Sequence, residues 1–158
     1  MQHRLTWLAI ILTFIFLIPG QLAGWLFAYV YQFLMGGVFD GNNLLDWPTN
    51  GWFSRIALEG FSNGLRGVVA GGLAMLVCGK LLKHADYNVV AYSNAAVVVA
   101  LTIITAVLGV ANRGLGLELL GLIANTVGVI GGLFAVAAQV STEQPVPMST
   151  RAAGVSKD

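Results

Sequence analysis

Residues that could carry chemistry gather at the start of one apolar segment, ALEGFSNGLRGVVAGG at 57–72. Glu59, Asn63 and Arg66 recur there at spacings of four and three, so a helix would place them on one face, together with Arg55. A carboxylate can accept a proton or hold a cation, and a guanidinium can hold an anion. Because an arginine at the bilayer centre costs about 2.5–3.5 kcal/mol, this polar stripe must face protein, a water-filled cavity or the headgroups.

The polar stripe has three interpretations. In the first, Arg66 is held by Glu59, Glu118 or both, as a structural clamp between helices. In the second, the same groups line a binding or conduction path. In the third, residues 52–66 form an amphipathic helix at the interface, before a shorter span. The candidate intramembrane polar cluster comprises Glu59, Asn63, Arg66 and Glu118.

Small residues recur at the spacing that lets two helix backbones come close. Glycine occupies every third or fourth position within 60–71, and it returns at spacings of seven and four within 121–132. The predicted helix-packing positions are Gly60, Gly64, Gly67, Gly71, Gly121, Gly128 and Gly132. Polar groups on the small faces of the third and fourth apolar segments are predicted to form interhelical hydrogen bonds, and they are Asn94, Thr105 and Asn125.

The residue types that membrane catalysis and cofactor binding require are scarce. The two histidines, His3 and His84, lie in polar flanks, where neither could ligate a haem at membrane depth. Cys78 is the single cysteine, so an internal disulfide and a cysteine cluster for zinc are both excluded. The sequence therefore predicts no catalytic residue, no metal and no cofactor, and an enzyme is the least favoured class of function.

The elements that must position these residues are apolar helices. The chain of 158 residues is 57% hydrophobic and 9% charged, with a mean hydropathy of +0.80, whereas soluble domains carry about 25% charged residues. Four segments supply the roughly 20 apolar residues that a membrane span needs, which predicts an all-α bundle of four transmembrane helices. The expected spans are about 5–34, 56–80, 89–111 and 117–138, in a domain covering 1–140. The polar tail, 141–158, is expected to be disordered.

The first span is expected to be one long helix kinked at Pro19, because its apolar run is too long for one span and too short for two. A re-entrant hairpin that turns at Pro19 and Gly20 is the alternative. The N-terminal MQHR followed by LTWLAIILTFIFLI also has the pattern of a secretory signal. Cleavage is not expected, since PGQLAG has Gln or Leu where small residues are needed.

Lysines and arginines near the span ends set the expected orientation. Arg4, Lys80 and Lys83 fall on one side of the membrane, and Arg55 and Arg113 on the other. Both termini are therefore expected to be cytoplasmic, in a bacterial inner membrane.

These features favour a small accessory or scaffold subunit, or an assembly factor, that acts by helix–helix association in a larger membrane complex. The alternative is a homo-oligomeric transporter or channel protomer whose path is lined by the polar cluster. The expected partners are the lipid bilayer and either other membrane subunits or further copies of the chain. A net charge of +1 gives no reason to expect nucleic acid.

Overall fold

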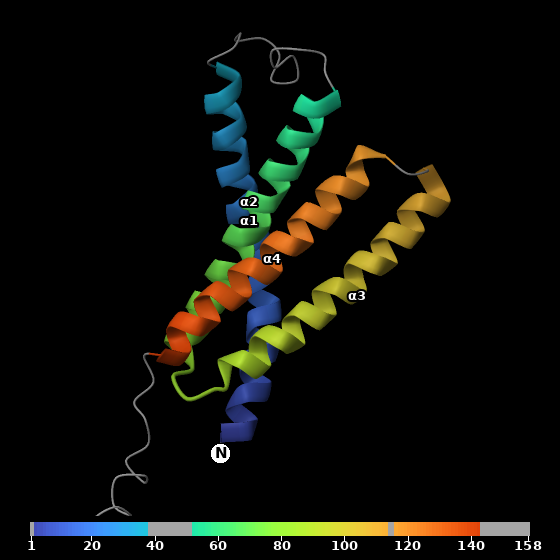
Figure 1. Ribbon diagram of the computed structural model, residues 1–158. Helices are drawn as coiled ribbons and strands as arrows, with labels where there is room; N and C mark the ends of the chain where they lie inside the picture. The colour runs from blue at the N-terminus through green and yellow to red at the C-terminus, as the bar shows by residue number, and fades with distance from the viewer. Residues whose placement is uncertain (1, 38–51, 114–115, 143–158) are drawn as a thin grey trace, which may run out of the picture.

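Four helices make up most of the described chain: α1 (Gln2–Gly37), α2 (Trp52–Leu81), α3 (Tyr87–Arg113) and α4 (Leu117–Thr142) (Figure 1). Each contains 22 to 29 consecutive residues that are apolar enough to cross a membrane. The predicted all-α bundle of four membrane helices is therefore confirmed. The structure, a computed structural model, describes residues 2–37, 52–113 and 116–142, with the side chains of 2–30, 60–109, 116 and 118–141.

Helix α1 runs without interruption through Pro19, for 36 residues. The alternative of a re-entrant hairpin at Pro19 and Gly20 is wrong. Pro19 lacks an N–H, so the carbonyl of Ile15 loses its usual helical donor. The helix nevertheless continues, and the next residue, Gly20, packs against the backbone of Ala70 on α2. The predicted disordered tail lies outside the described residues, except for Ser141 and Thr142, which complete α4.

Helix α2 is the centre of the bundle, because it packs closely against both α1 and α4. On the α1 side, a Cβ atom added at Gly20 would lie 2.7 Å from the carbonyl oxygen of Ala70. A Cβ at Gly24 would overlap the carbonyl oxygen of Arg66. These two glycines stand four residues apart, so α1 presents a small-xxx-small groove to the backbone of α2.

The contact between α2 and α4 is closer still and uses glycine from both helices. A Cβ at Gly67 would lie 2.7 Å from the backbone nitrogen of Val129, and it would overlap the carbonyl oxygen of Asn125. On α4, Cβ atoms at Gly128 and Gly132 would overlap backbone carbonyl oxygens of α2. The two backbones therefore touch directly, and dispersion forces in this contact stabilise the bundle where lipid removes any hydrophobic driving force.

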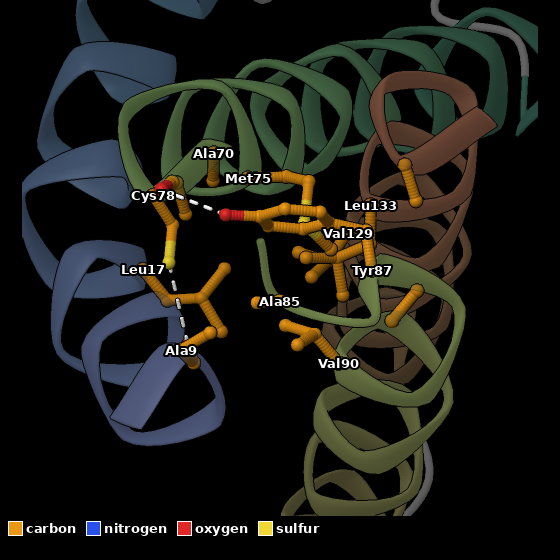
Figure 2. Close-up of a cluster of buried hydrophobic side chains, with 13 residues drawn as sticks. Ala9, Leu17, Ala70, Met75, Cys78, Ala85, Tyr87, Val90, Val129 and Leu133 are labelled. Carbon is orange, nitrogen blue, oxygen red and sulfur yellow. Dashed lines mark hydrogen bonds between the residues drawn. The ribbon is translucent and has the colours of Figure 1, made fainter. Parts of the chain in front are cut away.

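A cluster of buried side chains joins all four helices next to these glycine contacts, towards the N-terminal ends of α1 and α3 (Figure 2). Met75 and Cys78 of α2 lie beside Tyr87 at the start of α3, and Leu133 of α4 closes the cluster. The Cys78 thiol donates to the carbonyl oxygen of Ala9 on α1, at 3.5 Å. Through this cluster the start of α3 contacts the other three helices.

The turn between α2 and α3 is fixed by hydrogen bonds from both sides. The Asp86 carboxylate accepts from the backbone N–H groups of Asn88 and Val89, at 3.1 and 3.2 Å, which is the N-cap arrangement. The backbone N–H of Asp86 donates to the Thr6 hydroxyl of α1. The buried Tyr87 hydroxyl lies 2.9 Å from the Cys78 carbonyl oxygen, one of the carbonyls at the C-terminal end of α2.

Replacing Tyr87 by phenylalanine is expected to lower the free energy of unfolding by about 1–2 kcal/mol, because the carbonyls at the end of α2 lose a buried donor. Unfolding in mixed micelles of SDS and a mild detergent measures the change. Tyr92→Phe is the matched control, since Tyr92 is 67% exposed and keeps its ring against Phe134. Equal losses in the two variants would contradict a capping role for the Tyr87 hydroxyl.

Candidate functional site

Arg66 of α2 is held by Gln21 of α1. The Arg66 Nε–H donates to the Gln21 Oε1 atom at 2.8 Å. Gly24 lies one turn beyond Gln21 and contacts the backbone of Arg66. Because α1 and α2 approach closely at Gly24, the Arg66 guanidinium lies within hydrogen-bonding distance of the Gln21 amide.

Further polar side chains lie at the same level of the bundle. Asn125 of α4 contacts Gly67, the neighbour of Arg66, through its backbone carbonyl. One residue further, the Thr126 hydroxyl lies 2.6 Å from the Thr102 hydroxyl of α3. All four helices thus contribute to one polar layer, which comprises Gln21, Arg66, Thr102, Asn125 and Thr126.

The polar layer lies inside the apolar spans of the helices. Arg66 is six residues inside the start of its apolar span at Gly60, and Asn125 is seven residues inside the start of its span at Glu118. At 1.5 Å per residue these separations are about 9 and 10.5 Å along the helix axis. Polar groups at that depth are costly in lipid unless they bond to one another or to a ligand.

A pocket of about 200 Å³ opens beside the polar layer, between α1, α3 and α4. Phe14, Leu101 and Thr105 are its exposed lining residues and mark the open side. Its inner wall is part apolar and part polar. The lining residues are Phe14, Leu17, Gln21, Val98, Leu101, Thr102, Thr105, Leu122, Asn125, Thr126 and Val129.

The structure describes the side chains of three of the four residues in the predicted polar cluster. Asn63 and Arg66 are half-buried on α2, and the side chain of Glu59 lies outside the described residues. Glu118 is exposed and lines a second pocket of about 200 Å³ with Thr105 and Gly109. The Arg66 side chain bonds to Gln21, which the predicted cluster did not include.

The predicted packing glycines differ in what they contact. Gly67, Gly71, Gly128 and Gly132 lie directly against the backbone of the facing helix. A Cβ at Gly64 would be 3.8 Å from the nearest atom of α4, an ordinary contact, although the carbonyl of Gly64 lies against Gly128. Gly121 is buried. A Cβ at Gly60 would meet nothing within 4 Å.

The three predicted interhelical polar residues have different surroundings. Asn94 is fully buried, and its Nδ2 donates to the carbonyl oxygens of Ile10 on α1 and Val90 on α3, at 3.3 and 3.0 Å. Asn125 is half-buried, and its Oδ1 atom, like that of Asn94, is buried with no hydrogen-bond partner among the described residues. Thr105 is exposed and lies at the edge of both pockets.

Sequence reasoning missed Gln21, Thr126 and the Gly20/Gly24 pair. The four-residue spacing of those glycines was a readable signal for close packing. Gln21 follows Gly20 directly and belongs to the same contact, so the motif could have pointed to it. Thr126 gave no such signal, because a threonine in a membrane helix often bonds only its own backbone.

Among the residues that the structure describes, no group of three or more His, Cys, Asp or Glu side chains could hold a metal ion. Cys78 is buried and free of any disulfide. Compared with known proteins, the chain matches no family model, no curated protein and no solved structure.

Proposed function

We propose that this protein is a small accessory subunit or assembly factor of a larger membrane complex, and that it contacts its partner through α3. The observation that supports the proposal is the low burial of α3. In the most apolar stretch of α3, 17% of the residues are buried inside the protein. The corresponding stretches are 28% buried in α1 and 33% buried in both α2 and α4. In Figure 1 the C-terminal half of α3 lies beside α4 alone, well away from the far end of α1.

The outer face of α3, defined by Ala96, Ala100, Ile103 and Val107, is exposed at each of these four positions. Exposed apolar residues are ordinary in a helix that faces lipid, so exposure alone does not indicate a partner. The small pair Ala96 and Ala100, four residues apart, adds the spacing that lets a second helix approach closely. A transmembrane helix of another subunit is therefore the proposed occupant.

The close glycine contacts leave α3 as the helix available for association. Gly67 and Gly128 fix α2 against α4, and Gly20 and Gly24 fix α1 against α2.

The proposed orientation in the membrane follows from three exposed basic residues. They lie at the start of α1 and around the end of α2, and they are Arg4, Lys80 and Lys83. The positive-inside rule supports a proposed orientation with both termini in the cytoplasm, in a bacterial inner membrane. The free half of α3 would then lie in the outer leaflet.

A photoreactive amino acid placed at Val107 tests the proposal in native membranes. Val107 is 62% exposed, and Ile18 on α1, at 65%, provides the matched control position. We expect a polypeptide adduct from Val107 and only lipid adducts from Ile18. Lipid adducts alone at both positions, or the same polypeptide from both, would contradict docking through α3.

Weighing the intact assembly by mass spectrometry in lipid particles completes the test. The proposal expects other polypeptides in fixed stoichiometry with the 16.7 kDa chain, including the one crosslinked from Val107. A mass that is a simple multiple of the chain would instead favour the homo-oligomeric transporter or channel, and flux assays on Arg66→Gln would follow.

A further inference from the structure

Two pockets of about 200 Å³ each adjoin along the seam between α3 and α4. Thr105 of α3 and Leu122 of α4 line both pockets, so the two form one groove. Near Glu118 the groove lies between α3 and α4, and deeper in the bundle α1 adds a third wall. Together the pockets exceed the volume of about 300 Å³ at which small-molecule sites begin. The groove is therefore large enough for a ligand, and no residue that defines the outer face of α3 lines it.

The charge in this groove is confined to one end. Among the described residues that line the two pockets, Glu118 is the one that carries a charge, and it is exposed in the first turn of α4. Its carboxylate attracts a cation and accepts hydrogen bonds. The exposed Thr105 lines the same pocket, and its hydroxyl oxygen is a second acceptor. This end of the groove therefore suits a cation that carries N–H donors, which is a protonated amine.

The length and lining of the groove indicate the rest of the ligand. From Glu118 to Val129, which lines the deeper pocket, α4 rises by eleven residues, or about 16 Å. That length is about half of the hydrocarbon thickness of a bilayer, the depth of one leaflet. Apolar side chains follow one another along it, and they include Leu119, Leu122 and Leu17. The groove therefore matches an alkyl chain that fills one leaflet.

The groove is open to the bilayer along its side. Phe14 of α1 and Leu101 of α3 line it and are 39% and 48% exposed, so a chain enters sideways from the surface that lipid covers. We propose that the groove binds a membrane amphiphile with a protonated primary amine. The ammonium group donates to the Glu118 carboxylate, and the alkyl chain lies along the seam of α3 and α4 towards Val129.

Saturation binding of radiolabelled dodecylamine tests this proposal, with the purified protein in phosphatidylcholine nanodiscs and with empty nanodiscs subtracted. We expect saturable binding with a stoichiometry near one. Dodecyltrimethylammonium keeps the chain and the charge but has no N–H donor, and it should compete at least about threefold less well. Dodecanol keeps the chain but has no charge, and it should compete at least about tenfold less well. Equal competition by either compound, or no saturable binding, would overturn the proposal.

Glu118→Gln removes the charge that the ammonium group requires. Because Glu118 is exposed, the variant should fold, and its affinity for dodecylamine should fall at least about fivefold. Asp86→Asn is the matched control, since it makes the same loss of one carboxylate at the other end of α3. Asparagine is also a good N-cap residue, so this control should fold and bind dodecylamine with unchanged affinity.

Gly109→Leu fills the groove next to Glu118. Gly109 lines that pocket, and a Cβ there would meet nothing within 4 Å, so a leucine occupies the space without overlapping the backbone. Binding of dodecylamine should be abolished. Gly131→Leu makes the same substitution in open space outside both pockets and should leave binding unchanged. Unchanged affinity in either Glu118→Gln or Gly109→Leu would overturn the site.

Phosphatidylethanolamine in the nanodiscs distinguishes two sources of the amine. If this lipid displaces dodecylamine, the site is assigned to a phospholipid headgroup, and if it does not, the site is assigned to single-chain amines. Because the purified chain is used alone, the result is independent of whether α3 docks on a partner.

Discussion

Gly67→Ala is expected to be among the most damaging single substitutions in this protein, lowering the free energy of unfolding by about 3 kcal/mol. The added methyl group would overlap the carbonyl oxygen of Asn125 and lie 2.7 Å from the backbone nitrogen of Val129. Both obstacles are backbone atoms, which cannot rotate away as a side chain can. Helices α2 and α4 would have to separate, and their close contact would be lost along its length. Unfolding in SDS-containing mixed micelles measures the change.

Gly60→Ala is the matched control for this prediction. It makes the same substitution on the same helix, at a position where the new methyl group meets nothing within 4 Å. Gly131→Ala provides the corresponding control on α4, because Gly131 is exposed and faces open space. Both controls should be neutral or slightly stabilising, since alanine favours the helix by up to about 1 kcal/mol. Similar losses at Gly60 and Gly67 would show that glycine acts through the helix itself and not through the α2–α4 contact.

The contrast between these glycines marks how far the sequence can predict packing. Length and hydropathy determine the number and approximate position of the spans, because only a helix satisfies its backbone in lipid. The spacing of Gly60, Gly64, Gly67 and Gly71 predicts a close contact, but all four look equivalent in sequence. The point at which α4 crosses α2 decides which of them face a backbone, and a local pattern contains no information about that point.

Helix α1 shows a second reason why prediction fell short. Soluble helices reveal their packed side by an apolar stripe, but α1 is apolar nearly all round, so periodicity does not identify its buried face. The Pro19-Gly20 sequence suggested a break, because both residues disfavour helix in water. The same glycine in fact contacts the backbone of Ala70. Gln21, the residue that bonds Arg66, could therefore be placed only once this contact was known.

Gln21→Leu is expected to destabilise the protein more than the simultaneous replacement Gln21→Leu/Arg66→Met. The single change removes the acceptor that lies 2.8 Å from the Arg66 Nε atom. A hydrogen bond to a charged group contributes about 1.5–3 kcal/mol, and since Arg66 is half-buried we expect a loss of about 2 kcal/mol. Removing the guanidinium as well eliminates the unpaired charge, and should recover at least half of that loss. Unfolding of the two single variants and the double variant in mixed micelles gives the coupling energy.

The conservative variant Gln21→Glu separates this pairing from simple packing. A glutamate keeps the acceptor oxygen and adds a charge opposite to that of Arg66, so the folded protein should persist where Gln21→Leu is weakened. The sequence-based clamp hypothesis predicted the same kind of coupling for Arg66 with Glu59 or Glu118, so those pairs belong in the same set of cycles. Additive losses for Gln21 and Arg66, with coupling found instead at Glu118, would assign the guanidinium to the carboxylate and refute the amide as its anchor. Coupling at Gln21 would establish that α1 and α2 are joined by a charged hydrogen bond within their apolar spans, at the pocket between α1, α3 and α4.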